Sequence, residues 1–281
     1  MMEYILADKN TGSDRKAIQD AVDTAASTGI GTVLVPKGEW KLDGAVLLSD
    51  YARIILDGAH LTLKKGCDDE NAIRNTNAKA SHGYTNGAMQ TGITISGKNG
   101  AKITAPEPIF LRNSRNFTVE NLTLVSTRGF ALFMMMGNNG KVRNIELADC
   151  VKGVGVGATT IDCFFNNITG SVKEIAFDFD NALYLNLSFH AKGYDIINHI
   201  VRDVNVKTEK EFAHFDGDKK INRVLPNNVG RIVFTNIVAH KPQKTPAFHI
   251  ESAYHIVLQD IKTDGAVINE NLTPEQVYLY K

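Results

Sequence analysis

Apolar and polar residues follow one short phrase through the middle of the chain: an apolar residue, any residue, Asn or Asp, then Ile, Leu or Val. The Asn or Asp of each copy stands 23, 23, 19, 17, 33 and 24 residues after the one before it. The copies lie between Phe117 and Asp264, and they are Val119-Glu120-Asn121-Leu122, Val142-Arg143-Asn144-Ile145, Phe165-Asn166-Asn167-Ile168, the shortened Leu185-Asn186-Leu187, Val201-Arg202-Asp203-Val204, Phe234-Thr235-Asn236-Ile237 and Leu258-Gln259-Asp260-Ile261.

A β-type phrase that returns at such intervals indicates a solenoid, in which each coil adds strands to long parallel sheets. Leucine-rich repeats have a similar period, but residues 142–168 lack their dense leucine frame. In a parallel β-helix the apolar side chains point into a narrow core. Asn or Asp suits the turns because its short side chain bonds the backbone and tolerates the αL conformation. We therefore predict an all-β parallel β-helix with constant coils and loops of varying length.

The ends of the chain differ from the coils. Ser13 or Asp14 can cap a helix with apolar residues at helical spacing, which ends at Gly29 or Gly31. Such a helix would cover the open end of the first coil. The repeated phrase is lost after Asp264. We predict one domain over residues 1–281, with an N-terminal cap at 1–30, coils at 31–264 and a C-terminal cap at 265–281.

A second, shorter strand follows the long one in each predicted coil. Stacked coils would bring these short strands into one sheet, with neighbours about 4.8 Å apart. The predicted short strands are Phe130 to Met135, Val154 to Gly157, Glu174 to Asp180, His190 to Ile196, Phe212 to Asp218 and Phe248 to Glu251.

Two segments carry a resemblance to a known family. The segment from Gly31 to Trp40, after the predicted helix, resembles the entrance to the pectin-lyase-like superfamily, and Thr91 to Ile103 is similar to the I-x-I-x-G-x-G-x-I phrase of polygalacturonases. The chain thus resembles polygalacturonase-like glycoside hydrolases of family 28. The resemblance implies the pectin lyase fold, a right-handed parallel β-helix with an N-terminal helix. It also implies carbohydrate binding, with a poly- or oligosaccharide hydrolysed on the outer face of the short-strand sheet.

The catalytic aspartates of that family are not matched. Lys152 stands where the first aspartate is expected, and Lys173-Glu174 stands where the aspartate pair is expected. The family's Gly-His-Gly phrase falls on Ala191-Lys192-Gly193, and its basic phrase falls on His214-Phe215-Asp216. Glycosidic hydrolysis needs one protonated acid and one ionised base. Glu174 alone keeps a carboxylate at a matching position, so a hydrolase built on this chain needs acids from elsewhere.

Strand alternation supplies candidates for those acids. If Ile175, Phe177 and Phe179 face the core, then Glu174, Asp178 and Asp180 face outward, and we predict these three as catalytic residues. Residues two apart on a strand are about 6.7 Å apart, within the range of roughly 6.5 to 9.5 Å found for inverting carboxyl pairs.

The same alternation places further polar residues on the predicted outer face. His214 and Asp216 alternate with core residues, as does His249, and we predict that they bind substrate. We predict the same for Lys152, Lys173 and Lys192, whose charges would suit an anionic sugar such as a uronic acid.

Other functions fit the same residues. The acids could bind calcium while a lysine abstracts a proton, as in a polysaccharide lyase. Alternatively, the carboxylates are merely solvated, and the chain is a non-catalytic glycan-binding or structural β-helix, such as part of a phage tailspike. We expect no cofactor and no metal, because the histidines are scattered along the chain; those weighed as ligands are His190, His199, His214, His240, His249 and His255.

Composition narrows the partners. The chain has 43% hydrophobic and 22% charged residues, zero formal net charge and a pI near 7.1, so nothing draws it to nucleic acid or an anionic membrane. Cys67, Cys150 and Cys163 form no zinc or redox motif and are expected to be reduced. We expect no signal peptide, and a cytoplasmic or virion-associated protein, or a secreted one if the chain was trimmed. We expect a monomer or homotrimer.

Overall fold

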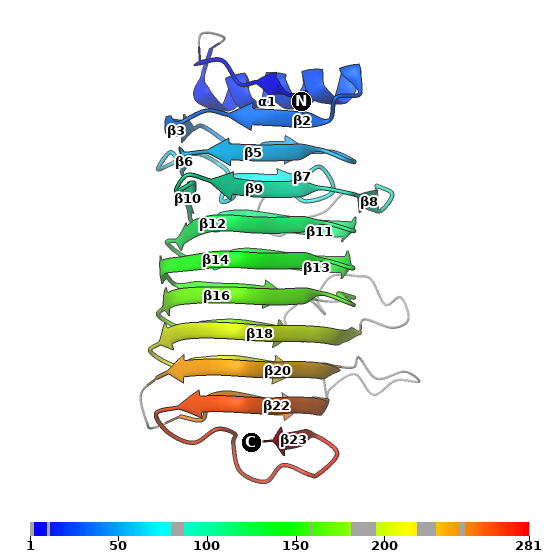
Figure 1. Cartoon of the computed structure of the whole chain (residues 1–281), viewed down its shortest axis with the longest axis vertical. Helices are drawn as coiled ribbons and strands as arrows, with labels where there is room; N and C mark the ends of the chain where they lie inside the picture. The colour runs from blue at the N-terminus through cyan, green and yellow to red at the C-terminus, as the bar shows by residue number, and fades with distance from the viewer. Residues whose placement is uncertain are drawn as a thin grey trace.

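The protein is a right-handed parallel β-helix, as the repeated phrase predicted. The computed structural model describes residues 3–9, 12–79, 87–157, 159–180, 195–217, 229–241 and 245–280. Figure 1 shows the strands stacked one below another, with the N-terminal helix at one end of the stack and the C-terminus at the other. Every strand pairing within the described residues is parallel, with each coil pairing to the coil before and after it.

The first sheet contains the long strands that carry the repeated phrase. It runs in the order β1 (Ile5–Leu6), β2 (Thr32–Val35), β5 (Arg53–Asp57), β9 (Thr94–Lys98), β12 (Thr118–Ser126), β14 (Lys141–Cys150), β16 (Phe164–Val172), β18 (Ile196–Thr208), β20 (Val229–His240), β22 (Tyr254–Thr263) and β23 (Val277–Tyr280). The strands β3 (Gly38–Leu42), β6 (Ala59–Leu63) and β10 (Lys102–Ala105) pair in series and join the second half of β12.

The second sheet contains the predicted short strands. It runs in the order β21 (Phe248–Ser252), β19 (Glu211–Asp216), β17 (Ile175–Asp180), β15 (Lys152–Val156), β13 (Phe130–Asn138), β11 (Ile109–Arg115), β7 (Ile73–Asn75) and β4 (Val46–Leu48), and β8 (Gln90–Thr91) pairs with the end of β11. Of the predicted strand His190 to Ile196, residues 190–194 lie outside the described residues, and Ile196 begins β18 of the first sheet.

The Asn or Asp of the repeated phrase bends each long strand. All six described copies have positive φ, between 52° and 58°. Asn144 donates a side-chain hydrogen bond to Asn121 (2.7 Å), and Asn167 donates one to Asn144 (2.9 Å). The aligned turns form a column, which we call the Asn ladder; its members are Asn121, Asn144, Asn167, Asp203, Asn236 and Asp260.

One predicted coil is wrong. The phrase at 185–187 implied a coil of its own between Asn167 and Asp203, but β16 pairs directly with β18, so a single longer coil joins these two residues. Residues 185–187 lie outside the described residues. The shortened phrase therefore adds no rung to the first sheet between β16 and β18.

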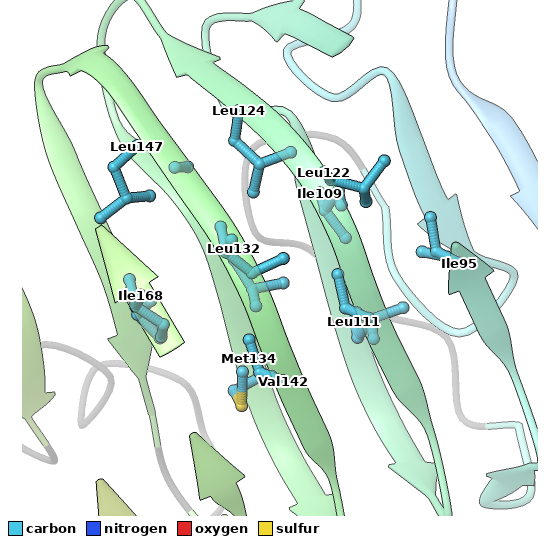
Figure 2. Close-up of a cluster of buried hydrophobic side chains, with 14 of the residues drawn as sticks. Ile95, Ile109, Leu111, Leu122, Leu124, Leu132, Met134, Val142, Leu147 and Ile168 are labelled. Atoms are coloured by element: carbon cyan, nitrogen blue, oxygen red, sulfur yellow. The ribbon is translucent and has the colours of Figure 1, made fainter. Parts of the chain in front are cut away.

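Aliphatic side chains from both sheets fill the space between them, as Figure 2 shows for Ile95, Leu122, Leu124, Leu132 and Ile168. In the C-terminal coils phenylalanine replaces them. The ring of Phe234 packs edge-on at 5.1 Å from Phe248 and at 5.8 Å from Phe215. Burying one such side chain stabilises the fold by about 1.5–3 kcal/mol.

The predicted helix is α1 (Asp14–Thr28), and it lies over β2 at the end of the stack (Figure 1). The Ser13 hydroxyl accepts a hydrogen bond from the Lys16 backbone N–H, and Gly29 ends the helix in the αL conformation with φ of 75°. Its apolar face contributes Ala17, Ile18, Ala21, Val22 and Ala25 to the core. Within the described part of the chain, no helix has the length and apolar character needed to cross a membrane.

The three cysteines carry free thiols, as expected from their spacing. Cys150 and Cys163 are buried, and burial raises the pKa of the Cys163 thiol to about 12.

Candidate functional site

A row of outward positions crosses the C-terminal strands of the second sheet. Gly155, Asp178, His214 and His249 are aligned in register on β15, β17, β19 and β21. Neighbouring strands in a sheet lie about 4.8 Å apart, so side chains separated by 23 to 36 residues in the sequence become direct neighbours. We call this row and the polar residues beside it the outer-face site.

Two carboxylates of the outer-face site come from one strand. Asp178 and Asp180 are only 4% and 7% exposed, and Asp180 lies beside Asp216 of β19 in register. One carboxylate oxygen of each aspartate and one ring nitrogen of His214 lie within 4.8 Å of one another. This spacing is shorter than the roughly 6.5 to 9.5 Å expected for an inverting pair and nearer to the roughly 5 to 5.5 Å of retaining enzymes.

His214 is held against this pair. Its Nδ1 lies 3.0 Å from Oδ1 of Asp178, and an ionised carboxylate only accepts hydrogen bonds, so Nδ1 carries the proton. Burial acts to lower the pKa of His214, but its hydrogen bond to Asp178 and the charges of Asp178, Asp180 and Glu211 outweigh this effect and raise the pKa to about 9. The imidazole is therefore a cation in a carboxylate-rich surrounding at neutral pH.

A second imidazole lies next to the first. The rings of His214 and His249 are 5.6 Å apart between centroids, and Nδ1 of His249 lies 2.9 Å from Oε1 of Glu211. Oε1 of Glu251 lies 3.7 Å from Nε2 of His214 and 3.9 Å from Nε2 of His249. The expectation of scattered histidines is thus wrong for this pair, since β19 and β21 bring them together. His199, His240 and His255 lie on strands of the first sheet, and His190 lies outside the described residues.

The alternation of inward and outward side chains does not hold at the start of strands β17 and β19. Two consecutive residues, such as Ala176 and Phe177, both enter the core where the chain turns into the strand. Ile175 is consequently only half-buried and pairs with Glu211 of the next strand, so its predicted inward position is wrong. Glu174 precedes β17 and lies apart from the aspartate pair along the chain.

Glu174 belongs to a charged edge of the sheet. Its carboxylate lies 3.2 Å from Nζ of Lys210 and 3.9 Å from Nζ of Lys152. Lys152 also lies over the ring of Phe130, with Nζ 5.0 Å from the ring centroid. Lys173 is exposed in the turn between β16 and β17, and Lys192 lies outside the described residues.

An apolar patch adjoins the site on the N-terminal side. Phe110, Phe130, Phe133 and Met135 project from the outer face of the second sheet and form a buried cluster with Ala78. A Cβ on Gly155 would lie 2.6 Å from the Phe133 ring, so glycine is required where this patch meets Asp178. The segment from Phe130 thus fills the core only in part.

Two acids of the site went unassigned in the sequence analysis. Glu251 alternates with the core residue Ile250, so its outward position could be read from the sequence, although no role was given to it. Glu211 was missed because it sits where alternation breaks down. Its place beside the site follows from its pairing with Ile175, and that pairing becomes known only from the register of β17 and β19.

Similar folds occur among solved structures. An iota-carrageenase of family GH82 from A. fortis is 14% identical with a TM-score of 0.63, over 89% of this chain and 56% of that chain. The tailspike protein of E. coli bacteriophage HK620, in complex with a pentasaccharide, is 12% identical with a TM-score of 0.63, over 96% of this chain and 60% of that one. The adhesin PfbA of Streptococcus pneumoniae is 13% identical with a TM-score of 0.53, over 99% and 92%.

The structural similarity agrees with the class of the protein, a right-handed parallel β-helix. At identities of 12–14% it shows the fold and nothing finer. The chain spans little more than half the length of the carrageenase. No protein-family model matches it, and no curated protein sequence matches it. The resemblance to family 28 therefore remains a prediction.

Proposed function

We propose that the protein binds a poly- or oligosaccharide across the outer face of the second sheet and hydrolyses a glycosidic bond at Asp178 and Asp180. The observation that carries the proposal is the pair itself: two nearly buried carboxylates at successive outward positions of β17, beside the imidazole of His214 on the next strand, β19. Their side chains contribute nothing to the apolar core.

Buried carboxylates cost stability unless they are paired, so a fold gains little from keeping two of them side by side. Clustered carboxylates of this kind are characteristic of functional sites. Hydrolysis of a glycosidic bond uses two such groups, one to protonate the leaving oxygen and one to act as base or nucleophile. Asp178 accepts the His214 Nδ1–H and suits the role of base or nucleophile, which leaves Asp180 as the proton donor.

The fold supports a glycan as the ligand. The similar structures include an iota-carrageenase complexed to iota-carrageenan fragments and a tailspike in complex with a pentasaccharide. The lysines at the charged edge, Lys152 and Lys210 beside Glu174 and the exposed Lys173, favour a sugar with an anionic substituent, such as a uronate or a sulfate. A polygalacturonase-like substrate would meet this requirement.

The proposal is tested by incubating the protein with neutral, uronic-acid and sulfated glycans and measuring new reducing ends. We expect Asp178→Asn to abolish hydrolysis of the responsive glycan and Asp180→Asn to reduce it at least about 100-fold, the scale of general acid catalysis. Glu146→Gln is the matched control, because Glu146 is exposed on the first sheet and bonds only Thr123 among the contacts described.

Three outcomes separate the alternatives. Turnover by Asp178→Asn at the wild-type rate would remove the aspartate from the mechanism. Binding of a glycan without new reducing ends would make the protein a non-catalytic glycan binder. Absorbance of an unsaturated uronide among the products would show a polysaccharide lyase.

A further inference from the structure

We infer that His214, His249 and Glu251 form a binding site for a divalent transition-metal ion of the Zn²⁺ class. The three side chains project from adjacent strands: His214 of β19 and His249 of β21 are in register, and Glu251 follows His249 by two residues, where the register between the two strands shifts. This inference goes beyond the glycosidase proposal and does not depend on it, because it concerns metal affinity and not turnover.

The geometry converges on one point. Both Nε2 atoms face the same oxygen, Oε1 of Glu251, at 3.7 and 3.9 Å, and one ligand atom from each of the three residues lies within 4.8 Å of the other two. Ligands bound to Zn²⁺ at about 2.0–2.2 Å in a tetrahedron lie about 3.3 Å from each other. Turning the Glu251 side chain, 47% exposed, can shorten its two contacts by about half an ångström, and the two histidine nitrogens, within 4.8 Å of each other, would approach by up to about 1.5 Å to reach this spacing.

The outer contacts leave Nε2 of each ring for a metal, and an ion that binds His214 displaces the proton that its imidazolium carries on Nε2. Nδ1 of His214 is bonded to Asp178 at 3.0 Å, and Nδ1 of His249 is bonded to Glu211 at 2.9 Å. Metal-binding histidines characteristically donate their second N–H to a carboxylate in this way, which orients the ring and increases its basicity. Two imidazoles sharing this arrangement, and facing one further carboxylate, are more than a chance grouping of acids.

The types of ligand atom at the site indicate which ion it would bind. Two imidazole nitrogens and one carboxylate oxygen suit Zn²⁺ and other divalent transition metals, whereas Ca²⁺ and Mg²⁺ require mostly oxygen ligands. Three protein ligands leave a coordination position for water or another small ligand. The side chains of His214 and His249 are 17% and 33% exposed, so an ion can enter from solvent.

The test uses the full chain after treatment with a chelator. Isothermal titration with Zn²⁺ and visible absorption with Co²⁺ should show one ion bound per chain, and titration with Ca²⁺ should show none. Glu251→Gln, a change on the exposed surface that leaves folding intact, should weaken Zn²⁺ affinity at least about 10-fold, and His249→Ala should weaken it further. Glu211→Gln, which removes only the outer partner of His249, should weaken it about 10- to 100-fold.

His240→Ala is the matched control. His240 is an exposed histidine at the end of β20 in the first sheet, and its Nδ1 lies 3.5 Å from Oδ2 of Asp264. Its Zn²⁺ affinity should equal that of the wild type. Absence of Zn²⁺ binding, or binding that Glu251→Gln and His249→Ala leave unchanged, would overturn the inference; circular dichroism would confirm that each variant is folded.

Discussion

The buried histidine of the first sheet should make the protein lose stability in mild acid. His199 is fully buried, its Nδ1 accepts a hydrogen bond from the Cys163 backbone N–H at 3.2 Å, and its Nε2 donates to the Thr160 carbonyl at 3.0 Å. Both ring nitrogens are thus committed in the neutral tautomer. Burial lowers the pKa of His199 to about 4, although its bonds to the backbone act in the opposite direction.

The direction and size of this loss of stability follow from the difference between the pKa of His199 in the folded and the unfolded chain. In the unfolded chain His199 takes up a proton below its ordinary pKa of about 6.5, whereas in the folded protein it does so only near pH 4. The contribution to stability is therefore complete above pH 6.5 and is lost as the pH falls to 4. A shift of about 2.5 units at about 1.4 kcal/mol per unit corresponds to about 3.5 kcal/mol, of which about 3 kcal/mol is lost by pH 4, where the buried imidazole is half protonated.

Urea denaturation followed by circular dichroism at several pH values between 7 and 4 measures this loss. His199→Gln lacks the titrating group, so its free energy of unfolding should fall by about 3 kcal/mol less than that of the wild type over this range. His60→Gln, a change at an exposed position, controls for removing any histidine. If wild type and His199→Gln lose stability in parallel, the buried imidazole does not carry the effect.

Two further substitutions test the core and the turns. Phe234→Ala should lower the free energy of unfolding by about 3–5 kcal/mol, because it removes the ring at the centre of the phenylalanine cluster. Its control is Leu279→Ala, at a side chain that is 54% exposed, which should lower the free energy of unfolding far less in the same urea titration. Arg231→Asn should raise the melting temperature, because Arg231 has φ of 52°, a conformation that costs most residues about 1–2 kcal/mol and suits Asn. An unchanged or lower melting temperature would contradict this explanation of the turn.

Much of the fold could be predicted from the sequence because Asn at the bends is a local signal. A second column of αL residues was missed, although each lies five positions before a member of the Asn ladder; its members are Asn116, Asn139, Asp162, Asn198, Arg231 and His255. The column was not recognised because two of its members are Arg231 and His255, and neither arginine nor histidine predicts an αL turn. A local pattern also could not show which strands pair, so the phrase at 185–187 was wrongly predicted to add a coil between β16 and β18.

The site was predictable only as far as alternation holds. Within the strands, alternation correctly placed Asp178 and His214 on the outer face. At the strand entry two consecutive residues turn inward, so Ile175 and Glu211 could not be placed. The meeting of His214 with His249 depends on the pairing of β19 with β21, which joins residues 35 positions apart and which no local pattern reveals.

The spacing of the Asn ladder has a consequence for how such a protein can change its length. Asn121, Asn144 and Asn167 are joined by side-chain hydrogen bonds across intervals of 23 residues, so each interval is an interchangeable module with the same junction on both sides. Genetic duplication or excision of the module from Asn121 to Asn144 would leave the neighbouring junctions intact and preserve the outer-face site, which begins downstream at Gly155. The same event between β17 and β21 would separate Asp178 from His214 or His214 from His249. Size and chemistry are therefore encoded in different stretches of the chain.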